Sequence, residues 1–381
     1  MVYKIASNQV NAIQAMKATR TLIVLTTGGE YAVSSGAAQT AITPTNINIR
    51  KQSNYGSAGV DGLSIGNATI FLQRAKRKIR ELSYNFDTDG YVAPDLTILN
   101  DIVTKSGINE MAYQQEPDSI LWCVREDGEF AGLTYQRSEN VIAWHRHKLG
   151  GTFGAGASAT GYGVVESVAS ISGQLTEDEL YVIVKRTING ATKRYIEFFS
   201  NFDFGSDVQD AFFVDSGLTY SGSAATTISG LDHLEGQTVS ILANGATHPD
   251  KTVSSGSVTL DRSVTKAHIG LSYNSTLQTM RIDAGGTEGT AQGKIKRIHD
   301  ITLRLFRTVG IQVGSSETDL DRIPFRSSAN AMDQALPLFT GDKEVEFRGG
   351  FDNDGFIVVK QNQPLPATIL AIFPRLQTFD Q

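Results

Sequence analysis

The chain has 381 residues, of which 40% are hydrophobic and 19% charged, a balance typical of folded proteins and not of disordered ones. Its 34 Lys and Arg residues against 40 Asp and Glu give a net charge of -6, which argues against a broadly basic nucleic-acid-binding surface. Cys123 is the only cysteine, which excludes an internal disulfide framework and a cysteine-cluster metal site. No stretch approaches the length of apolar sequence that a membrane-spanning helix needs, so we expect no such segment.

Residues 21–150 consist of short strand-like runs separated by turn dipeptides. Two hairpins are predicted there, one over residues 21–35 and a clearer one over residues 119–136, with Asp127-Gly128 as its turn. Units of four strands recur at roughly the spacing of β-propeller blades, although no internal sequence repeat is visible. We therefore predict a mainly β protein with a β-propeller-like body, which this chain need not complete.

One segment of the body carries the signals of an α-helix. Asp95 is a candidate N-cap, and Gly107 is a candidate stop. Three apolar residues share one face at helical spacing: Leu96, Leu99 and Val103. We predict a helix over residues 95–106 and no other substantial one.

The composition changes between residues 221 and 283, where Ser, Thr, Gly, Val and Ala dominate short strands around an Asn244-Gly245 hairpin turn. This change predicts a small β-barrel domain at 221–283, inserted into the larger body. The first part of the body is then 1–220, and 284–381 is its β-rich continuation. Within the continuation, residues 343–362 predict a hairpin over an Asp-Gly turn.

Candidates for site chemistry are few. His145 and His147 lie on the same side of a predicted strand, but no third ligand is near, so we favour a packed wall over a metal site. The Asp-rich turns 87–90 and 352–355 resemble fragments of calcium loops, yet neither continues to a glutamate at EF-hand spacing, and turn chemistry explains them. We find no nucleophile elbow, phosphate-binding loop or zinc-protease motif, and we predict neither enzymatic activity nor a cofactor.

The sharpest charge feature is a run of cations between residues 74 and 80. Such residues can simply prevent unwanted pairing at a solvated hairpin edge. Alternatively, they can meet a partner of opposite charge at a subunit boundary, or face DNA. On the second interpretation, this basic cluster is a subunit interface formed by Arg74, Lys76, Arg77, Lys78 and Arg80.

Residues 77–151 resemble tail proteins of tailed phages and prophages, of the kind related to tail tubular protein B, the nozzle of short-tailed phages. The motifs that carry this resemblance are RKIRELSYN, DGY, DLT, MAYQQEPDSILW, the DG turn before LTY, and AWHRH. The ending 363–376 also fits this family. Residues 233–260 are similar to a small β-domain of these phage proteins that is itself compared with one in ubiquitin-activating enzymes, a likeness that implies no ubiquitin chemistry.

The resemblance implies a structural virion protein of the phage tail, made in the host cytoplasm. Related nozzles form a hexameric ring that conducts DNA during ejection and holds fibres or adaptors. Family members carry a substantial region ahead of the stretch similar to residues 5–14, so a separate chain that supplies this N-terminal part is a further expected partner. An acidic conduit suits DNA passage because it repels phosphate. The alternative is a host-surface (glycan) binding or carbohydrate-active tail component.

Overall fold

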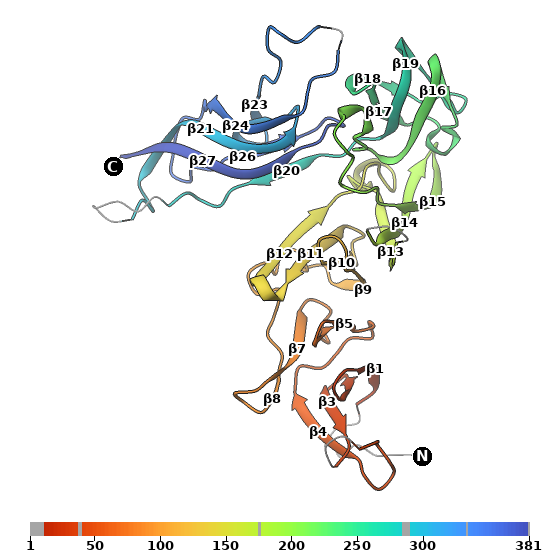
Figure 1. Cartoon of the computed structure of the whole chain (residues 1–381), viewed down its shortest axis with the longest axis vertical. Coiled ribbons are helices and arrows are strands. Elements are labelled where there is room, and N and C mark those ends of the chain that lie inside the picture. Colours follow the sequence, from red (N-terminus) through yellow and green to blue (C-terminus); the bar gives the residue numbers. More distant parts are fainter. Residues whose placement is uncertain (1–10, 37–39, 174–176, 284–289, 333, 380–381) are drawn as a thin grey trace. The chain divides into compact units, whose positions relative to one another are not determined.

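The computed structural model of the chain describes residues 11–36, 40–173, 177–283, 290–332 and 334–379. Strands hold 56% of the residues, which confirms the predicted mainly β class. They form antiparallel sheets, and none of the sheets in these segments closes on itself. The chain divides into two compact units (Figure 1), of which unit 1 comprises Met1–Arg186 with Lys193–Phe199 and unit 2 comprises Thr187–Thr192 with Ser200–Gln381.

Unit 1 is built from sheets that follow one another along the chain, and within each sheet every strand pairs with the next in sequence. The first sheet comprises β1 (Ile13–Ala18), β2 (Leu22–Thr26), β3 (Gly29–Ser34) and β4 (Asn48–Ser53). The second comprises β5 (Leu63–Ile65), β6 (Ala68–Leu72), β7 (Ile79–Asn85) and β8 (Gly90–Val92). The third comprises β9 (Ile108–Gln114), β10 (Ile120–Arg125), β11 (Phe130–Gln136) and β12 (Val141–His147). The fourth comprises β13 (Val164–Ile171), β14 (Glu179–Ile188) and β15 (Ala191–Phe198).

The two hairpins predicted in unit 1 are confirmed. β2 pairs with β3, and β10 pairs with β11 across the Asp127-Gly128 turn. Gly128 has a φ of 82°, a left-handed conformation that glycine adopts without the steric cost of a side chain. The turn between β14 and β15 has positive φ at both Asn189 and Gly190, which is the requirement of a tight two-residue hairpin loop.

The sheets of unit 1 pack face to face through successive hydrophobic cores. The core between the first and second sheets includes Ala15, Ile23, Leu25, Phe71 and Leu82. The core between the second and third sheets includes Ile70, Leu72, Ile79, Leu121, Cys123 and Leu133. The core between the third and fourth sheets includes Trp122, Val124, Phe130, Val165, Val182 and Val184. Because neighbouring residues of β10 enter different cores, the third sheet is buried on both faces.

Unit 2 contains three further sheets in its described segments. The first has the order β16 (Asp215–Ser229), β19 (Ser257–Leu271), β17 (Thr238–Ala243) and β18 (Ala246–Thr252). The second has the order β20 (Ser275–Gln278), β26 (Val358–Gln361), β22 (Gln312–Ser316) and β23 (Asp319–Arg322). The third is centred on β21 (Ile295–Thr308), which pairs with β24 (Phe339–Glu346), β25 (Phe351–Asp352) and β27 (Thr368–Phe379).

The sheets of unit 2 share cores formed by residues far apart in sequence. One core packs the second sheet against the third and includes Ile301, Leu303, Leu305, Val313 and Val359. Another joins the β16–β19 sheet region to the loops around β21 and β26 and includes Val208, Ala211, Leu242, Val309 and Leu365. The segment predicted as a small barrel therefore forms an open sheet, which begins at Asp215 and packs against other parts of unit 2.

The prediction of a helix over residues 95–106 is wrong. The segment forms consecutive turns, with the amide of Asn100 donating to the carbonyl of Thr97 and the amide of Val103 donating to that of Asn100. Asp95 does cap its start, accepting from the amide of Thr97 at 2.9 Å. The backbone bonds of these turns join residues three apart, so the four-residue spacing of an α-helical ladder is not formed, and the amide of Leu96 pairs with the carbonyl of Ile79 on β7, which ties the start of the segment to the sheet.

The prediction of a hairpin over residues 343–362 is also wrong. Strands β24 and β26 occupy this range, but they belong to different sheets: β24 pairs with β21, and β26 pairs with β20 and β22. The chain bends at 353–354, and Gly355 has a positive φ of 66°. The chain crosses from one sheet to the other there instead of folding back on itself.

Candidate functional site

The structure distributes the five cations of the basic cluster over different environments. Lys76 Nζ lies 3.1 Å from Glu126 Oε1, and Lys78 Nζ lies 2.8 Å from Asp95 Oδ2. Both pairs are formed within unit 1 and are partly exposed, so each contributes little to stability. These two lysines already have partners in their own chain.

Arg80 departs further from the predicted exposed interface. It is 9% exposed, and its guanidinium donates to the side chain of Gln73 and, at 2.6 Å, to the carbonyl of Ala93. The guanidinium carbon also lies 3.5 Å from the ring centroid of Tyr55, a cation–π contact. Because β7 is buried on both faces, the side chain of Arg80 lies inside unit 1. Its hydrogen bonds stabilise the second sheet there.

Arg74 and Arg77 are the two members of the basic cluster that remain available to a partner. Both side chains are exposed, and neither forms an ion pair with another described residue. The turn segment 97–106 lies beside them, since Thr104 Oγ1 donates to the carbonyl of Arg77 at 2.6 Å. Three large apolar residues of that segment are strongly exposed: Ile98, Leu99 and Ile102. Of the five residues in the predicted interface, Arg74 and Arg77 therefore remain as candidates, and they lie beside this exposed apolar segment.

The histidine pair forms part of an aromatic wall. His145 Nδ1 and His147 Nε2 lie 2.6 Å apart, and both rings contact Trp122. Burial and the neighbouring His145 lower the pKa of His147 to about 3, and burial also lowers the pKa of His145. Both rings therefore pack into a wall with Trp122. In the described segments, no three potential metal ligands come together anywhere.

The two Asp-rich turns use their carboxylates locally. Asp352 accepts hydrogen bonds from the amides of Asp354 and Gly355, each at 3.2 Å. Asp89 accepts from the hydroxyl of Tyr84 at 2.6 Å. The Asp352 bonds are of the kind by which Asp stabilises turns, whereas Asp89 is engaged by a tyrosine side chain.

Arg186 is the largest fully buried side chain and was not singled out by sequence. It lies on β14, on the face that packs against the third sheet. Its guanidinium makes two hydrogen bonds to the carboxylate of Glu197, at 2.5 and 3.1 Å, and one to the carbonyl of Gly150 at 2.7 Å. The buried positive charge is compensated, because the paired carboxylate of Glu197 neutralises it. This pair fixes the fourth sheet and does not face solvent as a reactive group.

The opposite face of the fourth sheet is apolar and exposed. On β15, the side chains of Ile196 and Phe198 are 76% and 65% exposed, and Phe198 contacts Tyr181 of β14. Ile171 of β13 is 54% exposed. A cationic rim lies beside them, where Glu166 pairs with both Lys185 and Arg194. We call this surface the outer face of the β13–β15 sheet.

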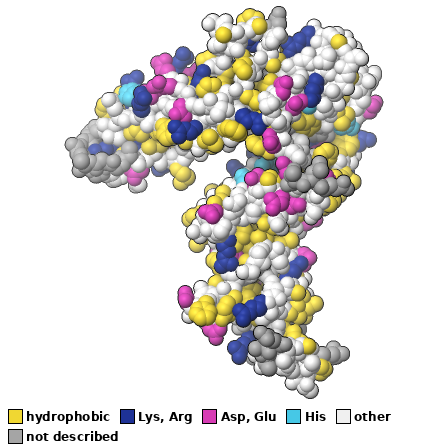
Figure 2. All heavy atoms as spheres, in the orientation of Figure 1, with side chains coloured by type: hydrophobic (Ala, Val, Ile, Leu, Met, Phe, Trp, Pro, Cys, Tyr) yellow, Lys and Arg dark blue, Asp and Glu magenta, His cyan; other side chains and the backbone are white. Residues whose placement is uncertain are grey.

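Charges of both signs are mixed on the surface. On the face shown in Figure 2, cationic and anionic side chains are interspersed, with hydrophobic side chains exposed among them. No continuous basic stripe is visible on that face. That face lacks the concentrated positive footprint of a DNA-binding protein.

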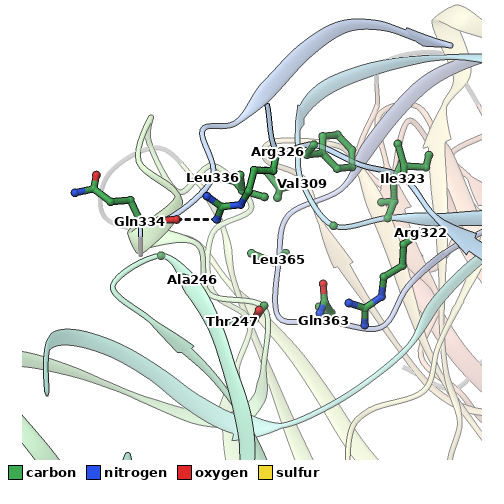
Figure 3. A pocket seen from close by; sticks show the side chains of 14 residues that line it. Ala246, Thr247, Val309, Arg322, Ile323, Arg326, Gln334, Leu336, Gln363 and Leu365 are labelled. Carbon is green, nitrogen blue, oxygen red and sulfur yellow. Dashed lines mark hydrogen bonds between the residues drawn. The ribbon is translucent and has the colours of Figure 1, made fainter. Parts of the chain in front are cut away.

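Unit 2 contains a pocket of about 250 Å³, which sequence analysis missed (Figure 3). It is lined by parts of the chain that are distant in sequence: the β17–β18 turn, the loop after β21, residues of the run 322–326 together with Gln334 and Leu336, and the loop after β26. The polar lining includes Arg322, Arg326, Gln334 and Gln363, and Phe325 stands between the two arginines in sequence. The run DRIPFR at 321–326 is the local signal that contains these cations.

Comparison with known proteins does not identify the chain. No protein-family model matches the sequence, and no curated protein is significantly similar to it. None of the short helical turns in the described segments could span a bilayer.

Proposed function

We propose that this chain is a structural subunit of a phage tail, which assembles with copies of itself into a ring around a DNA path. The sequence resemblance to nozzle proteins motivates the proposal. The observation that carries it is the stack of sheets in unit 1, which leaves an apolar face at one end. In the assembled tail, the ring is hexameric, as in related nozzles, and its propeller-like bodies are completed by neighbouring chains.

A stack of sheets needs a neighbour or a cap at each end, because an uncapped sheet exposes an apolar face to water. Propellers solve this problem by closing the circle, so that every sheet has a partner on both faces. The outer face of the β13–β15 sheet exposes Ile171, Ile196 and Phe198 instead. We assign this face to contact with a second copy of the chain.

The charges support passage of DNA and not tight binding. The chain has a net charge of -6, and three of the five cations in the basic cluster are occupied by contacts within the chain. An electrostatically repulsive or mixed wall lets phosphates slide past, whereas a basic wall would hold them. The free Arg74 and Arg77 then serve contacts between proteins.

The test is to image the purified full-length chain by electron microscopy and to measure its mass by light scattering after gel filtration. We expect rings of one fixed symmetry. Changing Ile196→Asp together with Phe198→Asp should shift the protein toward monomers, because a charge on each side chain opposes burial at an interface. Both positions are exposed, so the monomer should still fold.

Phe86→Asp is the matched control, because Phe86 is 87% exposed in the same unit but lies in the turn between β7 and β8. It should leave the ring intact. A wild-type protein that stays monomeric at every concentration would refute the assembly, and rings that survive the double substitution would exclude this face. Strong binding of duplex DNA with a steep salt dependence would contradict the conduit.

A further inference from the structure

The pocket in unit 2 combines positive charge with an apolar wall. Among the described residues that line it, Arg322 and Arg326 are cationic and none carries a carboxylate. This is unusual in a chain with more acidic than basic residues. A concave surface with two guanidinium groups and no counter-ion in its lining attracts an anion.

The two arginines differ in how they are held. Arg326 donates to the backbone carbonyls of Ala331 and, at 3.1 Å, of Gln334, a contact drawn as a dashed line in Figure 3. These neutral acceptors orient the guanidinium without cancelling its charge. Arg322 ends β23 and has no hydrogen bond or ion pair from its side chain to another described residue. It is therefore free to meet an anionic ligand with both edges of its planar fork.

The pocket lining also has an apolar part that is continuous with a buried core. Leu365 and Val309 belong to a buried core, and Gln361 fixes their loops because its side chain donates to the carbonyl of Val309 at 2.8 Å. Gly310 has a φ of 86°, and a Cβ there would collide with Leu365. The absence of that carbon leaves the loop close to Leu365 and the pocket open above it.

Phe325 supplies an aromatic surface to the same pocket. Its ring packs edge-on against Phe339, with centroids 6.0 Å apart, and Lys343 Nζ lies 5.5 Å from its centroid. The pocket of about 250 Å³ is smaller than typical sites for drug-sized molecules, which limits the ligand to a single ring or a compact chain.

We propose that this pocket binds a small ligand in which a carboxylate or phosphate is attached to a compact ring, with Arg322 and Arg326 holding the anion and Phe325 packing against the ring. The proposal goes beyond the assembly function and does not depend on it. An acidic sugar has this chemistry, because its charged group and its flat C–H face meet the two parts of the pocket. Carboxylate and phosphate forms share the anion, and the experiment separates them.

The test measures binding of glucuronate, glucose 6-phosphate and glucose to the full-length protein by titration calorimetry and ligand-observed NMR. We expect at least one of the two charged sugars to bind with a Kd on the order of 1 mM or tighter, and glucose to bind at least tenfold more weakly. The tighter of the two charged sugars identifies the anion. Arg322→Gln should weaken that binding at least tenfold, because it removes a charge-assisted pair of hydrogen bonds.

Arg281→Gln is the control, because Arg281 is an exposed cation of the same unit that does not line the pocket. It should leave binding unchanged while altering the net charge equally. Three results would overturn the proposal: no binding of either charged sugar, equal binding of glucose, or equal weakening by both substitutions. The readout is independent of ring formation, so a monomeric protein that binds glucuronate would separate this site from the proposed assembly.

Discussion

Changing Glu197→Gln should destabilise unit 1 strongly, because it leaves the buried charge of Arg186 without a counter-ion. Arg186 is fully buried, and both of its terminal nitrogens donate to the Glu197 carboxylate. The amide keeps the shape of the carboxylate but removes the counter-charge, and breaking a buried pair in this way costs roughly 3–5 kcal/mol. The side chain of Glu197 is 17% exposed, so water reaches the site in part, and we expect a loss near the lower end, about 3 kcal/mol.

Urea unfolding followed by tryptophan fluorescence measures this loss. The chain has two tryptophans, Trp122 and Trp144, and both lie in unit 1, so the signal reports on the unit that contains the ion pair. With a denaturant slope of about 2 kcal/mol per M, the unfolding midpoint should fall by roughly 1.5 M. The double change Arg186→Met with Glu197→Leu should recover most of the loss, because apolar residues of similar size replace buried pairs at little cost.

Arg194→Gln is the control on the opposite face of the same hairpin. Arg194 makes a similar two-bond contact with Glu166, but it is 56% exposed, and solvent screens the pair. Its replacement should not move the midpoint measurably. If Glu197→Gln unfolds at the wild-type midpoint, or if the two substitutions have equal effects, the reasoning from burial is refuted.

Further measurements address the histidine wall and its sheet. The pKa values of His145 and His147 are depressed in the folded chain, the latter to about 3, so the unfolded chain takes up protons first as pH falls below about 6.5. Stability should therefore be complete above pH ~6.5 and decline below it by up to about 1.4 kcal/mol per pH unit for each histidine, and His147→Gln should flatten this dependence in urea titrations at several pH values. Gly132→Ala should cost about 1–3 kcal/mol in the same assay, because the added Cβ would overlap the ring of His145, and an unchanged midpoint would contradict that packing. Burial raises the pKa of the Cys123 thiol well above its usual range, so a thiol-specific reagent should label it only in denaturant, and fast labelling of the native protein would count against a closed core.

The sequence pattern was sufficient to predict hairpins, in which strands adjacent in sequence pair with each other. The β10–β11 hairpin follows from alternating residues on each side of Asp127-Gly128, since turn and register are set within a few residues. The helix prediction failed because the amides of the segment pair three residues back and not four, while the bond from Leu96 to Ile79 of β7 holds its start against the sheet, a tertiary contact that local helix signals do not contain.

The candidate site was harder to predict because its residues meet only through long-range pairing. Arg322 and Arg326 stand in one short run, but Thr247 and Leu365 reach the same pocket from other sheets and loops. The burial of Arg80 was also not predictable: its charged neighbours in sequence suggest an exposed side chain, yet β7 is buried on both faces. Burial of a strand between two sheets cannot be inferred from the strand's own charges.

The order of strand pairing also affects how the chain can fold during synthesis. In unit 1, each sheet is made of consecutive strands, so it can form as soon as its own residues leave the ribosome, and each new sheet finds its predecessor already folded. Unit 2 has no such order, because β20 pairs with β26 and β21 pairs with β27, the last strand described. Strand β21 is therefore fully paired only after β27 has been synthesised, and long-range pairing of this kind is slow. The interval in which apolar surface is most exposed to aggregation and to chaperones thus falls within the synthesis of unit 2.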